Sequence, residues 1–180
     1  MKTDLKPLLH PVPIVLIGTT IKDQVNYTTI GDVAIAGMNP ALIMISLHAD
    51  HLTTEGLLEH GLFSVNTPDT SMLSKVDYCG MVSGRDVDKS SLFETIYDLE
   101  KTPYINNAVF SLICKVENSM QVEHRIIFVA KVLKTIVRDD LYTNDTILYN
   151  NISTILYGLN NSYYDTGKVI GTGYKEGKNL

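Results

Sequence analysis

Residues 83–89 (SGRDVDK) combine residue types that bind anions. Gly84 allows the backbone to approach a ligand closely, and Ser83 and the free amides can donate hydrogen bonds. Arg85 and Lys89 add positive charge, which favours a phosphate or another anion. A charged surface loop is the alternative, because the two aspartates of the segment can neutralise both bases. Such loops are common, so chemistry alone favours the second interpretation and leaves the first open.

A second group of chemically active side chains is His48, Asp50 and His51, in the sequence HADH. All three are metal-ligand types, but a metal site needs a fourth group, and none can be assigned from the sequence. A polar, solvated turn is therefore favoured, and we predict no metal. Cys79 lies two residues after Asp77 and lacks the electropositive surroundings of a reactive thiol, so we expect a buried structural cysteine. P-loop, G-x-G-x-x-G, H-E-x-x-H and C-x-x-C motifs are absent from the sequence.

The composition is that of a globular chain without a broad basic surface. Its 180 residues are 44% hydrophobic and 19% charged, with 15 basic and 20 acidic side chains and a net charge of −5. This balance argues against intrinsic disorder and disfavours nucleic-acid or anionic-membrane partners. The sequence has two cysteines, no apolar leader, and no hydrophobic run near the ~20 residues of a spanning helix. We therefore expect a soluble, cytoplasmic protein.

Strands in the first third of the chain, and short helices after them, must position these side chains. The run 41–47 is almost wholly apolar, so we expect both of its faces to be covered. Thr53 is expected to cap a short helix that Gly61 ends. A second helix is expected over 71–79, and Ser91 and Glu94 have the spacing of a capping box, which predicts a third. The strands expected here are 12–19, 27–36, 41–47 and 62–67.

The second half of the sequence returns to strands. The β-branched runs 108–118 and 125–138 are joined by a hairpin-like link near 119–123. Helices are too few to cross over between strands, which argues against a doubly wound parallel sheet. We predict a mostly β protein, an antiparallel barrel decorated with short helices. It forms a single domain over 1–180, with a divergent, Asn- and Tyr-rich segment from about residue 140.

The segments VNYTTIG, NPALIMISL, GLFSVNTP and VDYCGMVSGRDVDK resemble the flavin reductase-like family, and within it the flavoredoxin branch. The similarity covers roughly residues 11–89 and returns at His124 and near Gly167. It implies an antiparallel Greek-key split β-barrel that binds FMN without a covalent bond, usually as a homodimer with the flavin near the subunit interface. The implied function is that of an FMN-dependent oxidoreductase, with NAD(P)H as a candidate donor and a redox partner protein as a candidate acceptor.

The resemblance also implies, position by position, which residues bind the flavin. Asn26, Thr28 and Thr29 would lie along the isoalloxazine ring and hydrogen-bond its pyrimidine edge. Ser46 and Thr53 would lie on the phosphate side, where the start of a helix favours an anion. Arg85 and Lys89 would complete the cradle around the phosphate, where Ser83 and Gly84 allow close approach of the backbone. His124 would contact the flavin, and Tyr163 and Tyr164 would cover its ring.

Some of these positions have other interpretations, and some depart from the family pattern. His124 is equally well explained as a histidine in water, and the two tyrosines as a plug for the barrel. Asp32 stands where relatives usually carry tryptophan. In the HADH sequence, His48 and His51 replace two arginines of the family pattern, and Asp50 replaces a serine. A carboxylate beside a phosphate is repulsive. The alternative function is therefore a non-enzymatic flavin-binding protein, or a degenerate barrel with weakened FMN binding. No residue is assigned a catalytic role, because the flavin itself does the redox chemistry.

Overall fold

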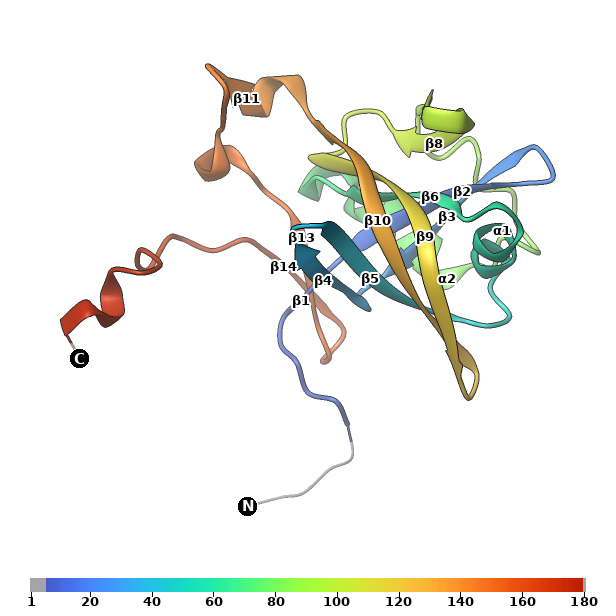
Figure 1. Cartoon of the computed structure of the whole chain (residues 1–180), viewed down its shortest axis with the longest axis horizontal. Coiled ribbons are helices and arrows are strands. Elements are labelled where there is room, and N and C mark those ends of the chain that lie inside the picture. Colours follow the sequence, from blue (N-terminus) through green and yellow to red (C-terminus); the bar gives the residue numbers. More distant parts are fainter. Residues whose placement is uncertain (1–5, 180) are drawn as a thin grey trace.

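The computed structural model describes residues 6–179, and its main feature is a curled antiparallel sheet of seven strands (Figure 1). The strands follow the order β3-β2-β6-β9-β10-β5-β4 across the sheet. This arrangement confirms the predicted mostly β, antiparallel fold. The bounds are β2 (Val15–Ile21), β3 (Gln24–Ile30), β4 (Val33–Met38), β5 (Ala41–His48), β6 (Leu62–Thr67), β9 (Phe110–Val122) and β10 (Arg125–Val137).

The two strands at the ends of this order, β3 and β4, are neighbours in the sequence. Only Gly31 and Asp32 separate them, so Ile30 and Val33 lie within roughly 11 Å of each other. The sheet must therefore curl until its two edges approach each other. Within the described residues no ladder joins β3 to β4, so the barrel is split along this side and not closed. The single strand expected over 27–36 is wrong, because the chain leaves one edge at Gly31 and joins the other.

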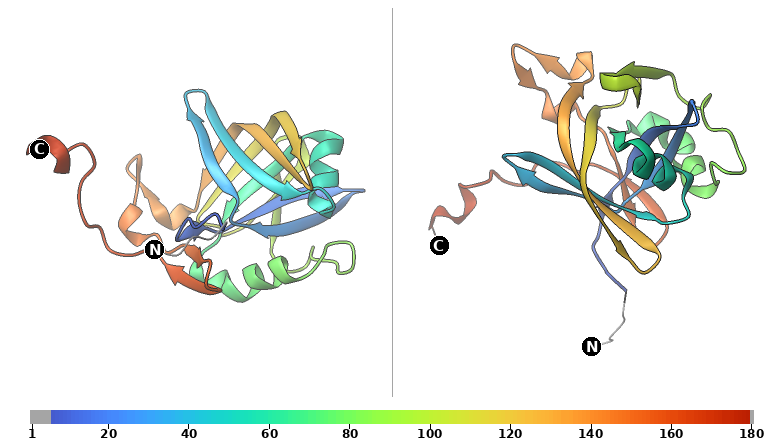
Figure 2. Two further views of the ribbon diagram at one scale, coloured as in Figure 1. Left: turned by 90° about the horizontal axis from the view of Figure 1, so that it is seen from below. Right: turned by 45° about the vertical axis from the view of Figure 1, so that its right-hand side comes forward.

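Smaller elements flank the curled sheet. β1 pairs with β13 and β13 with β14, which places these two strands of the Asn- and Tyr-rich segment beside the second helix (Figure 2). No helix within residues 6–179 is long and apolar enough to cross a membrane. The small strands are β1 (Val12–Pro13), β7 (Thr95–Asp98), β8 (Thr102–Ile105), β11 (Tyr142–Thr143), β12 (Thr146–Ile147), β13 (Ile155–Gly158) and β14 (Ser162–Asp165). The 3-10 helices are η1 (Thr70–Met72), η2 (Leu99–Lys101), η3 (Asp139–Leu141), η4 (Tyr149–Asn151) and η5 (Glu176–Asn179).

Two hydrophobic clusters lie on opposite faces of β2. Ile17 points to one face and packs with Phe63 and Phe128 inside the curl. Leu16 points to the other face and packs with Val76 of the second helix. Because successive side chains alternate between the faces, a strand covered on both sides is apolar along most of its length.

Strand β5 differs from this expectation for an apolar run. Ile43, Ile45 and Leu47 are buried, whereas Met44 is 39% exposed and Ser46 lines a cavity. The prediction that both faces of 41–47 are covered is therefore wrong. One face packs into the core, and the other faces the open side of the sheet.

Helix α1 (Leu52–His60) follows β5, and α2 (Leu73–Met81) follows β6 and η1. Gly61 ends α1 as predicted, in the left-handed conformation with φ 71°, and its amide donates to the Leu57 carbonyl. The cap prediction for Thr53 is wrong, because His51 occupies the N-cap position and Thr53 lies in the first turn. The second helix begins two residues later than predicted, after a 3-10 turn at 70–72.

The third predicted helix does not form. Glu94 does not cap a helix, since its carboxylate accepts a hydrogen bond from Asn106 Nδ2 at 2.9 Å. Its carbonyl also accepts from the Asn106 amide, which joins the two ends of the β7–β8 hairpin. The long-range partner replaces the local serine, so the capping-box pattern is satisfied elsewhere.

Candidate binding site

A polar pocket of about 230 Å³ lies between the edge strand β3, the start of α1 and the chain that follows α2. An edge strand presents unpaired backbone donors and acceptors, so a ligand can bind along it. The pocket brings together residues that the sequence places far apart. Of the predicted site residues it is lined by Asn26, Thr28, Thr29, Thr53, Ser83, Gly84 and Lys89.

Asn26 links the strand, the helix and the glycine loop. Its side-chain amide is buried and donates to Thr53 Oγ1 at 2.7 Å, which ties β3 to the first turn of α1. Gly84 lies directly against it, because a β-carbon at that position would come within 2.2 Å of Asn26 Oδ1. Only glycine allows the loop to approach this closely.

Lys89 is buried in the pocket wall, with 2% of its surface exposed. Its Nζ donates to the carbonyls of Cys79 at 3.3 Å and of Val82 at 3.0 Å, at the C-terminal end of α2. A cation at this position satisfies carbonyls that the helix leaves unpaired. Burial lowers the pKa of Lys89. The ammonium therefore holds the 83–89 segment against α2.

Arg85 lies beside the polar pocket, in an adjoining hollow of about 140 Å³. Its Nη2 is 3.2 Å from a carboxylate oxygen of Glu55, and its Nε donates to the Asp50 carbonyl at 3.1 Å. Within the described residues neither base of the 83–89 segment forms a salt bridge with an aspartate of that segment. The internally neutralised loop is therefore not what forms here.

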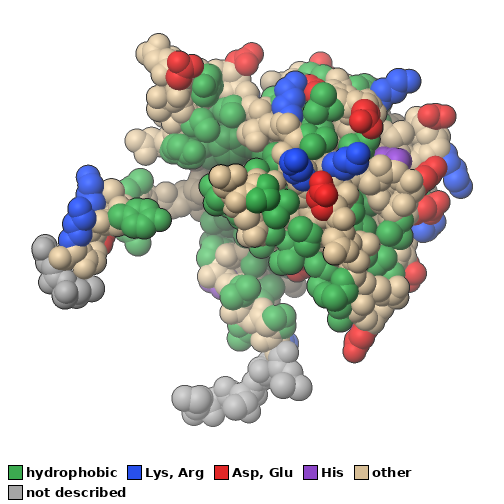
Figure 3. Space-filling model, viewed as in Figure 1, with side chains coloured by type: hydrophobic (Ala, Val, Ile, Leu, Met, Phe, Trp, Pro, Cys, Tyr) green, Lys and Arg blue, Asp and Glu red, His purple; other side chains and the backbone are tan. Residues whose placement is uncertain are grey.

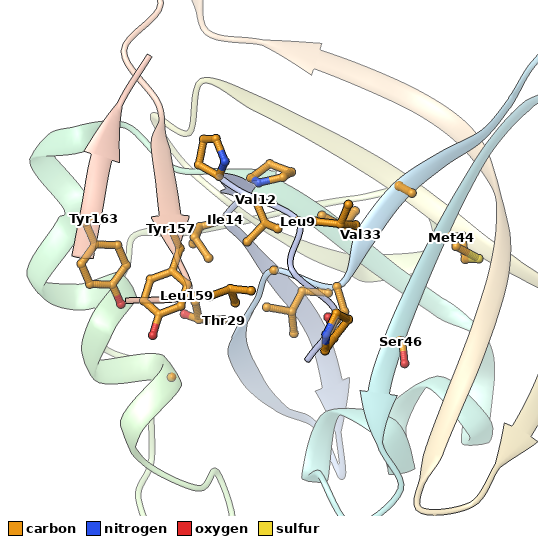
Figure 4. A pocket seen from close by; sticks show the side chains of 18 of the residues that line it. Leu9, Val12, Ile14, Thr29, Val33, Met44, Ser46, Tyr157, Leu159 and Tyr163 are labelled. Atoms are coloured by element: carbon orange, nitrogen blue, oxygen red, sulfur yellow. The ribbon is translucent and has the colours of Figure 1, made fainter. Parts of the chain in front are cut away.

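A larger, mostly apolar cavity of about 780 Å³ adjoins the polar pocket and shares Thr29, Gly80 and Met81 with it. Figure 4 shows Tyr163 on one side of this cavity and Ser46 of β5 on the opposite side. The Tyr163 hydroxyl donates to Asp77 Oδ1 at 2.7 Å. Burial and the adjacent carboxylate of Asp77 raise the pKa of Tyr163.

Tyr164 and His124 lie outside both cavities. Tyr164 follows Tyr163 on β14 and points to the opposite face of the strand, where its ring meets the edge of His10 with centroids 5.5 Å apart. His124 lies in the turn between β9 and β10, with a side chain that is 65% exposed and a ring centroid 5.1 Å from that of His48. Most of the predicted residues thus lie around the polar pocket, and Ser46 and Tyr163 line the apolar cavity. Tyr164 and His124 are peripheral to both.

Arg125 is a site residue that the sequence did not reveal. Its guanidinium pairs with the Asp32 carboxylate, donates through Nε to Ser46 Oγ at 2.8 Å, and donates through Nη2 to the Ser46 carbonyl at 2.7 Å. An aspartate in place of tryptophan signals the need for a counter-charge. The identity of that charge depends on the register of β5 with β10, which places Arg125 opposite His48.

The HADH turn is largely exposed, and the Asp50 side chain is 90% exposed. Over residues 6–179, no three histidine, cysteine or acidic side chains are placed to hold a metal ion. Cys79 is a buried structural residue, as predicted, with 1% of its surface exposed, and burial raises the pKa of its thiol.

The sequence pattern of the "Flavin reductase like domain" matches residues 8–157. The chain belongs to this family. Flavoredoxin from Methanosarcina acetivorans is similar, with 31% identity, coverage of 99% of this chain and 97% of that chain, and a TM-score of 0.95. No curated protein sequence matches the chain.

More distant family-like structures share the fold. Flavoredoxin of Desulfovibrio vulgaris (Miyazaki F) is 24% identical, with coverage of 99% of this chain and 100% of that chain and a TM-score of 0.88. An FMN-binding protein from Thermus thermophilus with bound 1-cyclohex-2-enone is 17% identical, with coverage of 96% and 98% and a TM-score of 0.82. At these identities the likeness concerns the split-barrel fold.

Proposed function

We propose that this chain is an FMN-binding oxidoreductase that passes electrons through non-covalently bound FMN. The observation that carries the proposal is a polar pocket that adjoins a larger apolar cavity at the split edge of the sheet. A flavin ring has a hydrogen-bonding pyrimidine edge and an apolar dimethylbenzene edge, so it matches this division. The larger cavity, of about 780 Å³, falls in the size range of cofactor sites. Similarity to a flavoredoxin over nearly the whole chain supports the same conclusion.

The residues of the polar pocket would hold the flavin and orient it. Asn26, Thr28 and Ser83 offer amide and hydroxyl groups, and Lys89 and Gly84 fix the loop that forms the opposite wall. The apolar cavity would exclude water from one side of the ring. When bound, FMN supplies the two-electron chemistry, and the protein supplies binding, orientation and shielding.

The two carboxylates that depart from the family pattern are compatible with this site. Asp32 is neutralised by Arg125 at the rim of the apolar cavity. Asp50 points to solvent, where its charge is screened. Neither is an unpaired carboxylate inside the polar pocket, and this supports FMN binding over the degenerate alternative.

The absorption spectrum of the purified protein, and its titration with FMN, test the proposal. We expect flavin absorption bands or a saturable quenching of FMN fluorescence, and oxidation of NADH or NADPH when FMN is added. Binding without oxidation of either nucleotide would indicate a flavin carrier that takes electrons from a redox partner protein. Absence of FMN binding would refute the proposed function.

We also propose a homodimer. The exposed apolar side chains include Ile35 and Met38 on β4, and Val169 and Ile170 on the C-terminal segment, where Ile170 is 94% exposed. Figure 1 shows that this segment runs away from the sheets, and Figure 3 shows hydrophobic side chains over the β4–β5 hairpin. A second copy of the chain would cover such surfaces.

A further inference from the structure

A segment near the N-terminus forms one wall of the apolar cavity. It contributes the lining residues Pro7, Leu9, Pro11, Val12 and Pro13, and Figure 4 includes Leu9 among the labelled side chains around the cavity. The other lining residues belong to β3, β4, β5, β10, β13, β14, α2 and the links between elements. Most of the cavity is therefore built from helices and strands, whereas residues 7–11, which we call the N-terminal strap, belong to neither.

The N-terminal strap is attached to the rest of the protein through the chain that follows it. There β1 pairs with β13, and the Ile14 amide donates to the Ile155 carbonyl at 3.1 Å. The amides of Leu8 and Leu9 instead donate to the carbonyls two residues before them, at 3.0 and 2.9 Å. Both leucine side chains are largely exposed. A segment with local hydrogen bonds and exposed side chains opens at a low cost in free energy, so the strap can move while the sheet stays folded.

A second attachment is the contact between the rings of His10 and Tyr164, which we call the His10 latch. The two rings meet edge to face, with centroids 5.5 Å apart. Gly158 on β13 leaves room for them, because a β-carbon there would come within 2.8 Å of His10 Cε1 and of Tyr164 Cε2. A contact between two rings contributes a small fraction of the free energy of folding, so the latch can open without unfolding of the protein.

Leu9 is the apolar side chain that the latch holds in place. It directly precedes His10, it lines the apolar cavity, and its side chain is 73% exposed, so it lies at the mouth of the cavity. A ring bound in the cavity would remove part of this apolar surface from water, which is favourable. Closure of the strap is therefore more favourable over an occupied cavity than over an empty one.

We propose that the N-terminal strap is a gate of the apolar cavity, which admits and releases a flavin ring when the His10 latch opens and covers the ring with Leu9 when the latch closes. The inference rests on the proposed function and adds control of access to the same site. Because only the open form admits a ligand, the association rate is proportional to the fraction of molecules with an open strap. A closed strap also retards departure, so loosening the latch raises the association and the dissociation rate together.

Stopped-flow fluorescence of FMN tests the gate. Quenching after mixing gives the association rate, and recovery of fluorescence after dilution gives the dissociation rate. His10→Ala removes one ring of the latch and should raise both rates by roughly threefold or more, with a smaller change in the Kd for FMN. Leu9→Ser weakens the cover and should raise the dissociation rate by roughly three- to tenfold, and the Kd with it. Both side chains are exposed, so neither variant is expected to disturb the core.

Two matched controls accompany these variants. Leu8→Ser changes a neighbouring leucine that is 67% exposed and is not among the described residues that line the cavity, so both rates should stay at the wild-type values. Tyr164→Phe keeps the ring that His10 contacts and loses only the hydroxyl, which Asn160 Nδ2 contacts at 3.1 Å, so it should also behave as wild type.

The outcomes separate the gate from the proposed function. An unchanged association rate in His10→Ala, with FMN still bound, would refute the gate and leave the proposed function standing. A dissociation rate of Leu9→Ser equal to that of Leu8→Ser would refute the cover by Leu9 in the same way. Failure of the wild-type protein to bind FMN would overturn the proposed function and the gate with it.

Discussion

At the scale of single residues, Lys89 is a cation whose hydrogen-bond partners are main-chain carbonyls. The resemblance to the family assigns it to the phosphate cradle, together with Arg85. In the structure its ammonium is buried and anchors the 83–89 segment to the C-terminal end of α2. That position makes it a part of the wall that would face the flavin ring, which FMN and riboflavin share.

Lys89→Met tests this role. The substitution retains the approximate length of the side chain but leaves the carbonyls of Cys79 and Val82 without their donor. The free-energy penalty for such unsatisfied buried groups is roughly 1–3 kcal/mol. We expect affinity for FMN and for riboflavin to fall alike, by about tenfold, in fluorescence-quenching titrations. Lys115→Met, on an exposed position of β9, is the control and should change neither affinity. A loss confined to FMN would instead place Lys89 at the phosphate.

At the scale of elements, α1 must lie close to the sheet if Thr53 and His51 are to reach the pocket. Gly56 makes this approach possible, because a β-carbon there would come within 2.8 Å of Ile21 Cγ1 and 3.0 Å of Thr19 Cγ2. Both contacts are with β2, so any side chain at this position pushes the helix away from the sheet.

Gly56→Ala is therefore expected to destabilise the fold despite the better helix propensity of alanine. Overpacking of this kind costs about 1–3 kcal/mol, against a gain of up to ~1 kcal/mol from helix propensity. The free energy of unfolding from urea denaturation measures the difference. Glu59→Ala, at an exposed position of the same helix, should leave stability within about 0.5 kcal/mol of wild type. If Gly56→Ala and wild type have equal free energies of unfolding, α1 can shift away from the sheet without a loss of stability.

Most elements could be predicted from local patterns, because β-branched runs and the glycine after α1 determine local conformation by themselves. The errors occur where a distant partner decides. The break at Gly31 and Asp32 depends on which strands lie at the two edges of the sheet. The local spacing predicts a helix cap at Glu94, but the side-chain amide of Asn106, which follows β8, donates to its carboxylate.

The same division applies to the site. The 83–89 segment has a recognisable composition, so its residues could be proposed from the sequence. The pairing of Arg125 with Asp32 and the contact of His124 with His48 require the register of β5 and β10. No spacing along the chain encodes that register, because the pairing depends on packing of both strands against the core.

At the scale of the whole molecule, the exposed C-terminal segment and the β4–β5 hairpin determine the expected assembly. Static light scattering at micromolar concentration should give twice the 20.0 kDa mass of the chain. The physical reason is the apolar surface that a single copy leaves in water, including Val169, Ile170 and Met38. A mass of one chain at these concentrations would rule out the homodimer and place any bound flavin within a single subunit.

The reactivity of the two cysteine thiols can report on local opening of the structure. Cys114 lies in the cluster inside the curled sheet, and Cys79 lies in the wall of the polar pocket, with 0% and 1% of their surfaces exposed. A thiol-specific reagent can therefore modify either one only after the surrounding structure opens. Modification of Cys114 requires disruption of the core, whereas Cys79 packs in the second hydrophobic cluster and borders the polar pocket, so we expect it to become accessible first when the 83–89 segment leaves α2. The ratio of their labelling rates thus measures how often the pocket opens without unfolding of the protein, and a ligand held in the pocket slows one rate without a matching effect on the other.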